Sequence, residues 1–146
     1  MRETERTAMP PNDLTHLLEQ AQRRVSRDLD RELAQVGASG EQWRVLDSLA
    51  DEVGRPMGEL ATMLSMNPPT MTKLVDRMVA SGLVQRIADV QDSRRVLVYI
   101  TDAGLELVAK LSSRADAFHA GLSAALSPKD ADKLQKLLTC LLSRQV

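Results

Sequence analysis

The sequence predicts a mainly helical fold with one small β-hairpin, and three observations support this prediction. Apolar residues recur every three or four positions over most of the 146 residues, which is the spacing of one helical face. Over residues 96–100 they alternate sides instead, which is the spacing of a strand. Polar residues able to cap a helix precede most apolar stretches. With 43% hydrophobic and 27% charged residues, the chain is expected to form a single domain over residues 1–146.

A long first helix is predicted over residues 12–37. Asn12 is its expected N-cap, because its side chain can accept a hydrogen bond from an exposed backbone N–H group. Gly37 is its expected end, because glycine adopts the left-handed closing conformation without strain. The apolar stripe of this helix consists of Leu14, Leu17, Leu18, Ala21, Val25, Leu29, Leu33 and Val36.

Three shorter helices are predicted next, over residues 41–51, just after Pro56, and over residues 67–82. Pro68 fits the first turn of the last of these, because proline has no backbone N–H group to leave unpaired. The expected N-caps are Asn67 and Ser39, and Ser39 can form a capping box with Gln42. Gly54 and Gly82 are the expected helix ends.

A hairpin and two more helices complete the predicted order. Residues 83–87 and 96–100 are the expected strands, and the polar residues 88–95 between them are the expected exposed tip. Helical spacing returns over residues 102–146, where Thr101 and Ser127 are the expected caps of two helices.

Short helices followed by a two-stranded hairpin give the order of a winged helix-turn-helix module, here over residues 39–101. In such modules the helix before the hairpin enters the major groove of DNA. Its exposed arc here carries small hydroxyls and charges suited to phosphates and base edges, although helix caps and a solvated charged face are the alternative interpretation. The residues of this arc are Thr70, Thr72, Lys73, Asp76 and Arg77, and Arg94 and Arg95 lie at the hairpin tip.

Several motifs resemble those of the multiple-antibiotic-resistance regulator (MarR) family. They are Met57-Gly58-Glu59-Leu60-Ala61, the helix from Asn67-Pro68-Pro69-Thr70 to Asp76-Arg77-Met78-Val79, Ser81-Gly82-Leu83-Val84-Gln85-Arg86, Asp92-Ser93-Arg94-Arg95 and Ile100-Thr101-Asp102-Ala103-Gly104. The resemblance covers all but roughly the first eleven residues. It implies a homodimer that binds a palindromic operator in double-stranded DNA, usually as a repressor, and that responds to a small-molecule effector.

The resemblance also assigns roles to individual residues. It implies that the wing residue Arg94 reaches the minor groove, that Asp92 holds the shape of the wing, and that Asn67 pairs with Arg94 by a hydrogen bond. We add Arg86 and Arg95 as further expected phosphate or groove contacts. The complete set of expected DNA-binding residues is Pro68, Thr70, Thr72, Lys73, Arg77, Arg86, Asp92, Arg94 and Arg95.

Residues 12–37 and 102–146 are the expected dimerisation helices. Together they carry more apolar surface than a winged module of this size can cover, and a second copy is the simplest cover. A two-fold dimer would present its two reading helices about one helical turn of DNA apart, roughly 34 Å, which requires a near-palindromic site.

The sequence offers little for other chemistry. Cys140 cannot form an internal disulfide, and together with His16 and His119 it is too small a set for a zinc site. We therefore expect no metal, cofactor or catalytic activity, and, without a signal peptide or membrane span, a cytoplasmic protein. Two alternatives stay open: a protein-interaction module that binds no operator, and a thiol-based redox sensor that uses Cys140.

The net charge of −1 argues against DNA binding through bulk positive charge. Residues 67–101, however, carry a local excess of five cations over three acids. The cations are Lys73, Arg77, Arg86, Arg94 and Arg95, and the acids are Asp76, Asp89 and Asp92. The sequence names no effector, and Trp43, His16 and Arg24 are open candidates for a ligand pocket between the dimer helices and the winged module.

Overall fold

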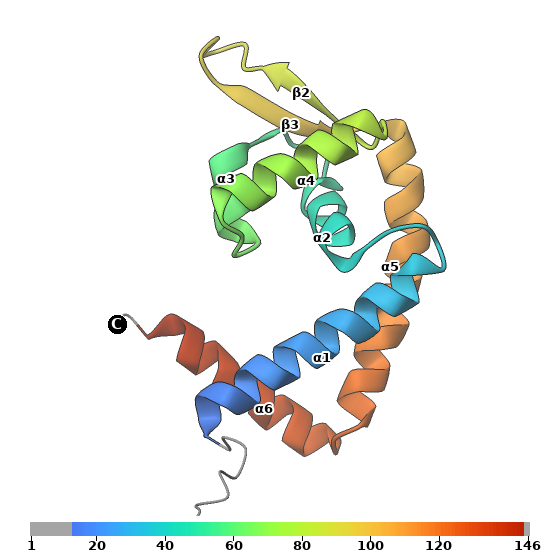
Figure 1. Ribbon diagram of the computed structural model, residues 1–146, viewed down its shortest axis with the longest axis vertical. Helices are drawn as coiled ribbons and strands as arrows, with labels where there is room; N and C mark the ends of the chain where they lie inside the picture. Colours follow the sequence, from blue (N-terminus) through green and yellow to red (C-terminus); the bar gives the residue numbers. More distant parts are fainter. Residues whose placement is uncertain (1–12, 145–146) are drawn as a thin grey trace, which may run out of the picture.

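The computed structural model describes residues 13–144 and confirms a mainly helical fold. Its elements are α1 (Leu14–Ala34), α2 (Gly40–Leu49), β1 (Arg55–Pro56), α3 (Met57–Met63), α4 (Pro68–Ala80), β2 (Val84–Ala88), β3 (Val96–Ile100), α5 (Asp102–Ala124) and α6 (Pro128–Ser143). The winged module, formed by α2, α3, α4 and the strands, lies at one end of the molecule, and α6 lies at the other (Figure 1). The helix α5 runs along both regions (Figure 1).

One apolar core holds the winged module together. The side chains of Leu46, Met78, Val98 and Leu111 are fully buried, so α2, α4, β3 and α5 all contribute to it. The C-terminal half of α1 joins this core through Leu29 and Leu33. Each such side chain removed from water contributes about 1.5–3 kcal/mol.

The sheet has three strands rather than the predicted two. The order is β1-β3-β2, with both pairs antiparallel, and Val84 faces Ile100 while Arg55 faces Val98. The strand β1 has only two residues, which is too short to show an alternating pattern in the sequence. Pro56 is tolerated because β1 lies at the edge of the sheet.

The predicted helix caps are confirmed except at the first helix. Ser39 and Gln42 form both hydrogen bonds of a capping box, and Asn67, Thr101 and Ser127 each accept a bond from a backbone N–H group of the first turn. The helix α1 is capped by Asp13, whose Oδ1 accepts a bond of 2.8 Å from the backbone N–H of His16. Asn12, the predicted cap, lies outside the described residues.

Gly54 is not the helix stop that the sequence predicts. The helix α2 ends at Leu49, and Glu52 is the residue that adopts a positive φ, at 62°. Gly54 is needed for close packing instead, because a Cβ atom there would lie 2.3 Å from Cζ of Tyr99. The other two predicted stops, Gly37 and Gly82, do have positive φ, at 85° and 74°.

Candidate nucleic-acid interface

The helix α4 has one buried and one exposed face. Met71, Leu74, Val75 and Met78 are buried in the core, as their spacing requires. The opposite side is open to solvent, as predicted. Its exposed residues include Pro68, Thr70, Thr72, Lys73 and Arg77.

The start of α4 is fixed by local hydrogen bonds. Asn67 Oδ1 accepts a bond of 2.9 Å from the backbone N–H of Thr70. The Thr72 hydroxyl donates to the Pro68 carbonyl at 3.0 Å, so it is left with acceptor capacity toward DNA. Asn67 is therefore a helix cap here, and no hydrogen bond joins it to Arg94 anywhere in residues 13–144, contrary to the sequence expectation.

The tip of the wing is a closed turn held by Asp92. Its Oδ1 accepts a bond of 3.1 Å from the backbone N–H of Arg94, and its carbonyl accepts one of 2.9 Å from that of Arg95. Asp89 donates its backbone N–H to the Arg95 carbonyl at 2.8 Å and so closes the turn. These bonds agree with the expected role of Asp92 in shaping the wing. They leave the side chains of Arg94 and Arg95 exposed.

The cations of this surface fall into two groups. Within residues 13–144, Lys73, Arg77, Arg94 and Arg95 form no ion pair, so their charges are available to a partner. Arg86 differs, because its Nη2 lies 2.6 Å from Oδ1 of Asp76. The apolar spacing predicts Asp76 on the exposed arc but does not predict this pairing, since a separation of ten residues across a turn leaves no periodic signal.

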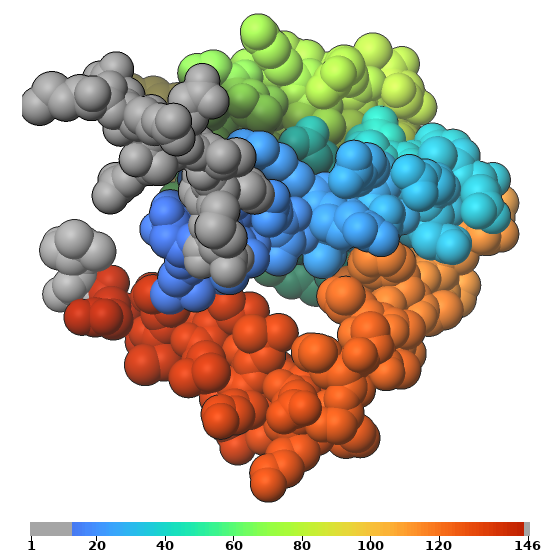
Figure 2. All heavy atoms as spheres, turned by 60° about the horizontal axis from the view of Figure 1, so that its bottom comes forward, coloured from blue at the N-terminus to red at the C-terminus, as the bar shows by residue number. Residues whose placement is uncertain are grey.

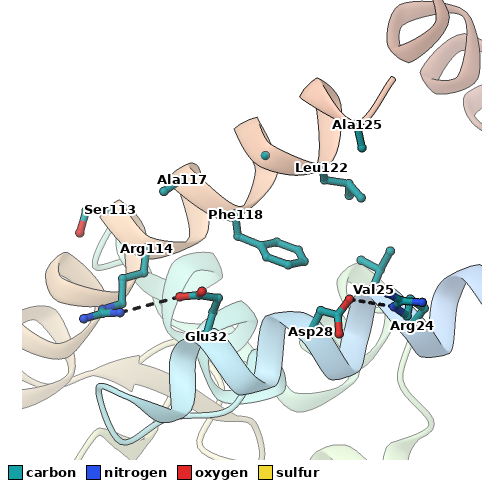
Figure 3. Close-up of a pocket in the computed structure, with 11 residues that line it drawn as sticks. Arg24, Val25, Asp28, Glu32, Ser113, Arg114, Ala117, Phe118, Leu122 and Ala125 are labelled. Carbon is teal, nitrogen blue, oxygen red and sulfur yellow. Dashed lines mark hydrogen bonds and ion pairs between the residues drawn. The ribbon is translucent and has the colours of Figure 1, made fainter. Parts of the chain in front are cut away.

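A cleft of about 680 Å³ lies between α1 and α5, away from the wing. Phe118 and Leu122 of α5 point toward α1, and Val25 of α1 points back toward α5 (Figure 3). Ion pairs border the cleft. They join Arg24 to Asp28 at 3.1 Å and Arg114 to Glu32 at 3.8 Å (Figure 3).

The three candidate pocket residues lie in different places. Arg24 lines the α1–α5 cleft, whereas Trp43 and His16 are not among its lining residues. Trp43 is buried, with its ring centroid 5.6 Å from that of His119, and its Nε1 has no hydrogen-bond partner within the described part of the chain. The core-packing interpretation of Trp43 therefore holds.

Three observations bear on other chemistry. In residues 13–144, no three His, Cys, Asp or Glu side chains cluster in a way that could hold a metal ion. Cys140 is exposed on α6, far along the chain from the wing. None of the helices in that same range is long and apolar enough to cross a membrane.

Comparison with known proteins identifies the module. Residues 39–96, which span α2 to the start of β3, match the model of the MarR family. The winged module of this chain is of the MarR type. It is 30% identical over 96 residues to the multiple antibiotic resistance protein MarR of Escherichia coli, covering 66% of this chain and 65% of that protein. An uncharacterised HTH-type transcriptional regulator of Mycobacterium bovis is 29% identical over 120 residues, covering 82% and 84%.

Solved structures show the same winged-helix fold. The S. aureus MepR–DNA complex has a TM-score of 0.83 and 25% identity, and covers 91% of this chain and 98% of that one. A mutant E. coli MarR in complex with operator DNA has a TM-score of 0.82 and 26% identity, covering 88% and 93%. The relatives named above are an HTH-type transcriptional regulator and an antibiotic-resistance protein, so this chain is similar to regulators of transcription.

Proposed function

We propose that this MarR-family protein is a homodimeric repressor that binds a near-palindromic operator in double-stranded DNA and releases it when a small effector binds. The observation that carries the proposal is the exposed, unpaired set of cations on α4 and the wing. MepR and MarR, which share this fold, are seen in complex with DNA.

The exposed side of α4 has the composition of a reading helix. Thr70 and Thr72 offer hydroxyl oxygens, and Lys73 and Arg77 offer cations to phosphates or guanine edges. The wing presents Arg94 and Arg95 on a turn that Asp92 closes. The proposed direct contacts are thus Pro68, Thr70, Thr72, Lys73, Arg77, Arg94 and Arg95, with Asp92 as the support of the wing.

The second copy is proposed from the apolar surface outside the winged module. Not one residue of α6 is buried. In α1 and α5 the exposed leucines lie in the halves that leave the module. An apolar surface made of so many exposed leucines is costly in water and is typical of a permanent interface. Its exposed leucines are Leu14, Leu17, Leu122, Leu126, Leu134, Leu137, Leu138, Leu141 and Leu142.

The effector is proposed to be small and largely apolar. The α1–α5 cleft is lined by Val25, Phe118 and Leu122 and bordered by charged pairs, which suits a ring or short chain with polar ends. A ligand there would bias the angle between α1 and α5 and so the spacing of the two reading helices. This proposed site lies between α1 and α5, whereas the sequence left open a pocket between the dimer helices and the winged module.

A selection experiment tests the proposed function. Purified protein is incubated with fragmented genomic DNA of the organism that encodes it, and the bound fragments are sequenced. We expect enrichment of a short near-palindromic motif. Enrichment of no DNA would overturn the proposal and favour the protein-interaction alternative. A Cys140→Ser variant that still released this DNA on peroxide treatment would dismiss the thiol-sensor alternative.

A further inference from the structure

One ion pair ties the reading helix to the wing. Arg86 Nη2 of β2 lies 2.6 Å from Asp76 Oδ1 of α4, and the two side chains are 31% and 57% exposed. Of the ion pairs among residues 13–144, it is the one that joins α4 to the hairpin. It is also the feature that separates Arg86 from the other cations of this surface.

The register of the sheet explains where Arg86 points. Arg86 faces Val98 across the β2–β3 ladder and shares its side of the sheet with Val84 two residues earlier. Val84 and Val98 are both buried in the core that α4 helps to form. The stem of Arg86 therefore leaves the sheet on the side that faces α4, and its guanidinium meets Asp76 there.

Two hydrogen bonds hold the root of the hairpin, and one of them is accepted by Met78 of α4. The backbone N–H of Leu83 donates to the Met78 carbonyl at 3.0 Å, and the Thr101 hydroxyl donates to the Gly82 carbonyl at 2.6 Å. Arg86 lies three residues beyond Leu83, about 10 Å farther along the extended chain. A second anchor at that distance resists bending of the wing more effectively than the root alone.

We propose that Arg86 is a positioning residue for DNA binding, not a phosphate contact. Together with Asp76 it sets the angle between α4 and the wing, so that α4 and Arg94 reach their grooves at the same time. This inference rests on the proposed function, because it concerns the geometry of the same DNA-binding surface. It also explains why an acidic residue, Asp76, lies on a surface that is proposed to face DNA.

The direction in which Asp76→Asn changes operator affinity distinguishes a positioning role of Arg86 from a phosphate contact. If Arg86 contacts a phosphate, removal of the neighbouring acid leaves operator affinity unchanged or raises it, because it lowers repulsion from DNA. If the pair positions the wing, Asp76→Asn weakens operator binding about as much as Arg86→Gln. Because the pair is partly exposed, either variant is expected to lower operator affinity by about 3- to 20-fold in a dimer that carries two such pairs.

Binding titrations at several salt concentrations complete the test, with wild-type protein and the selected operator duplex. Positioning predicts that Asp76→Asn, Arg86→Gln and the double variant lose similar affinity for the operator, since the second change removes nothing further. It also predicts an unchanged salt slope and unchanged affinity for a random duplex. A salt slope reduced by about 0.9 per subunit in Arg86→Gln alone, with Asp76→Asn at or above wild-type affinity, would overturn the inference.

A measurement without DNA separates this inference from the proposed function. Spin labels are placed on the exposed positions Thr72→Cys and Val90→Cys in a Cys140→Ser background, and the labelled protein is diluted with unlabelled protein. Positioning predicts a broader α4–wing distance distribution in Asp76→Asn, and an unchanged distribution would overturn it. Failure of wild-type protein to select any DNA would instead refute the proposed function, whatever the spin labels report.

Discussion

The winged module and the distal helices bury their apolar residues to very different extents. The ten-residue helix α2 buries five residues, whereas the sixteen-residue helix α6 buries none. The helix α1 shows both behaviours, because Leu29 and Leu33 are buried near its end while Leu14 near its start is 67% exposed. The module thus has a complete core within one chain, whereas the distal helices leave their apolar faces exposed.

The boundary between the two regions does not follow the helix ends. The first half of α5 belongs to the module core through Val108, Leu111 and Ala115, and the exposed leucines begin at Leu122. Figure 2 shows α1 between the winged module and α6. A continuous α5 therefore links the proposed dimer interface to the DNA-binding end, so a change in one region can move the other.

The largest expected effect is in the module core. Leu46→Ala should lower the free energy of unfolding by about 2–5 kcal/mol, because Leu46 is fully buried and its truncation leaves a cavity. Urea unfolding followed by circular dichroism measures this. Val90→Ala, at a position 100% exposed on the wing, is the control. If Leu46→Ala destabilised the protein no more than the control, the module core would not be complete within one chain.

The second expected effect is in the distal region. Leu137→Lys should raise the dimer dissociation constant about tenfold or more, because it places a charge in the proposed apolar interface. Sedimentation equilibrium measures this, with Ser143→Lys on the polar side of α6 as the control. If Leu137→Lys and the control associate equally, or if the wild-type chain is a monomer, the apolar surface has another partner.

The third expected effect is on the wing. Arg94→Ala should weaken operator binding by about 1–3 kcal/mol if Arg94 reads a groove. A gel-shift titration at fixed salt measures it. Arg23→Ala is the control, since Arg23 lies on α1 opposite the apolar stripe. If the two variants bind the operator with equal affinity, the wing does not contribute to DNA recognition.

The smallest expected effect concerns a single phosphate contact on α4. Lys73→Gln should reduce the slope of log K against log salt by about one for each phosphate that the lysine neutralises. The control is Lys129→Gln on α6, which removes the same charge at the far end of the molecule. If log K falls with log salt at the same slope for Lys73→Gln and the wild-type protein, Lys73 neutralises no phosphate and faces solvent in the complex.

The sequence predicted what depends on local chemistry. The helices follow from apolar spacing and from caps such as Ser39 and Asn67, whose bonding partners lie three residues away. It could not predict β1, because two residues have no period, nor the role of Gly54, which depends on Tyr99 about 45 residues later. The pairing of Arg86 with Asp76 was missed for the same reason, since it depends on how α4 and the hairpin fold together.

Footprinting of the selected duplex is the sharpest test of the proposed DNA-binding mode, because it reports on α4, the wing and the dimer at once. A two-fold dimer of winged modules predicts two protected half-sites whose centres lie about 10–10.5 base pairs apart. Arg94→Ala should lose protection at the flanking minor grooves and keep it at the centres of the half-sites. Protection of a single half-site by a monomer, or uniform weak protection without a register, would contradict this mode of binding.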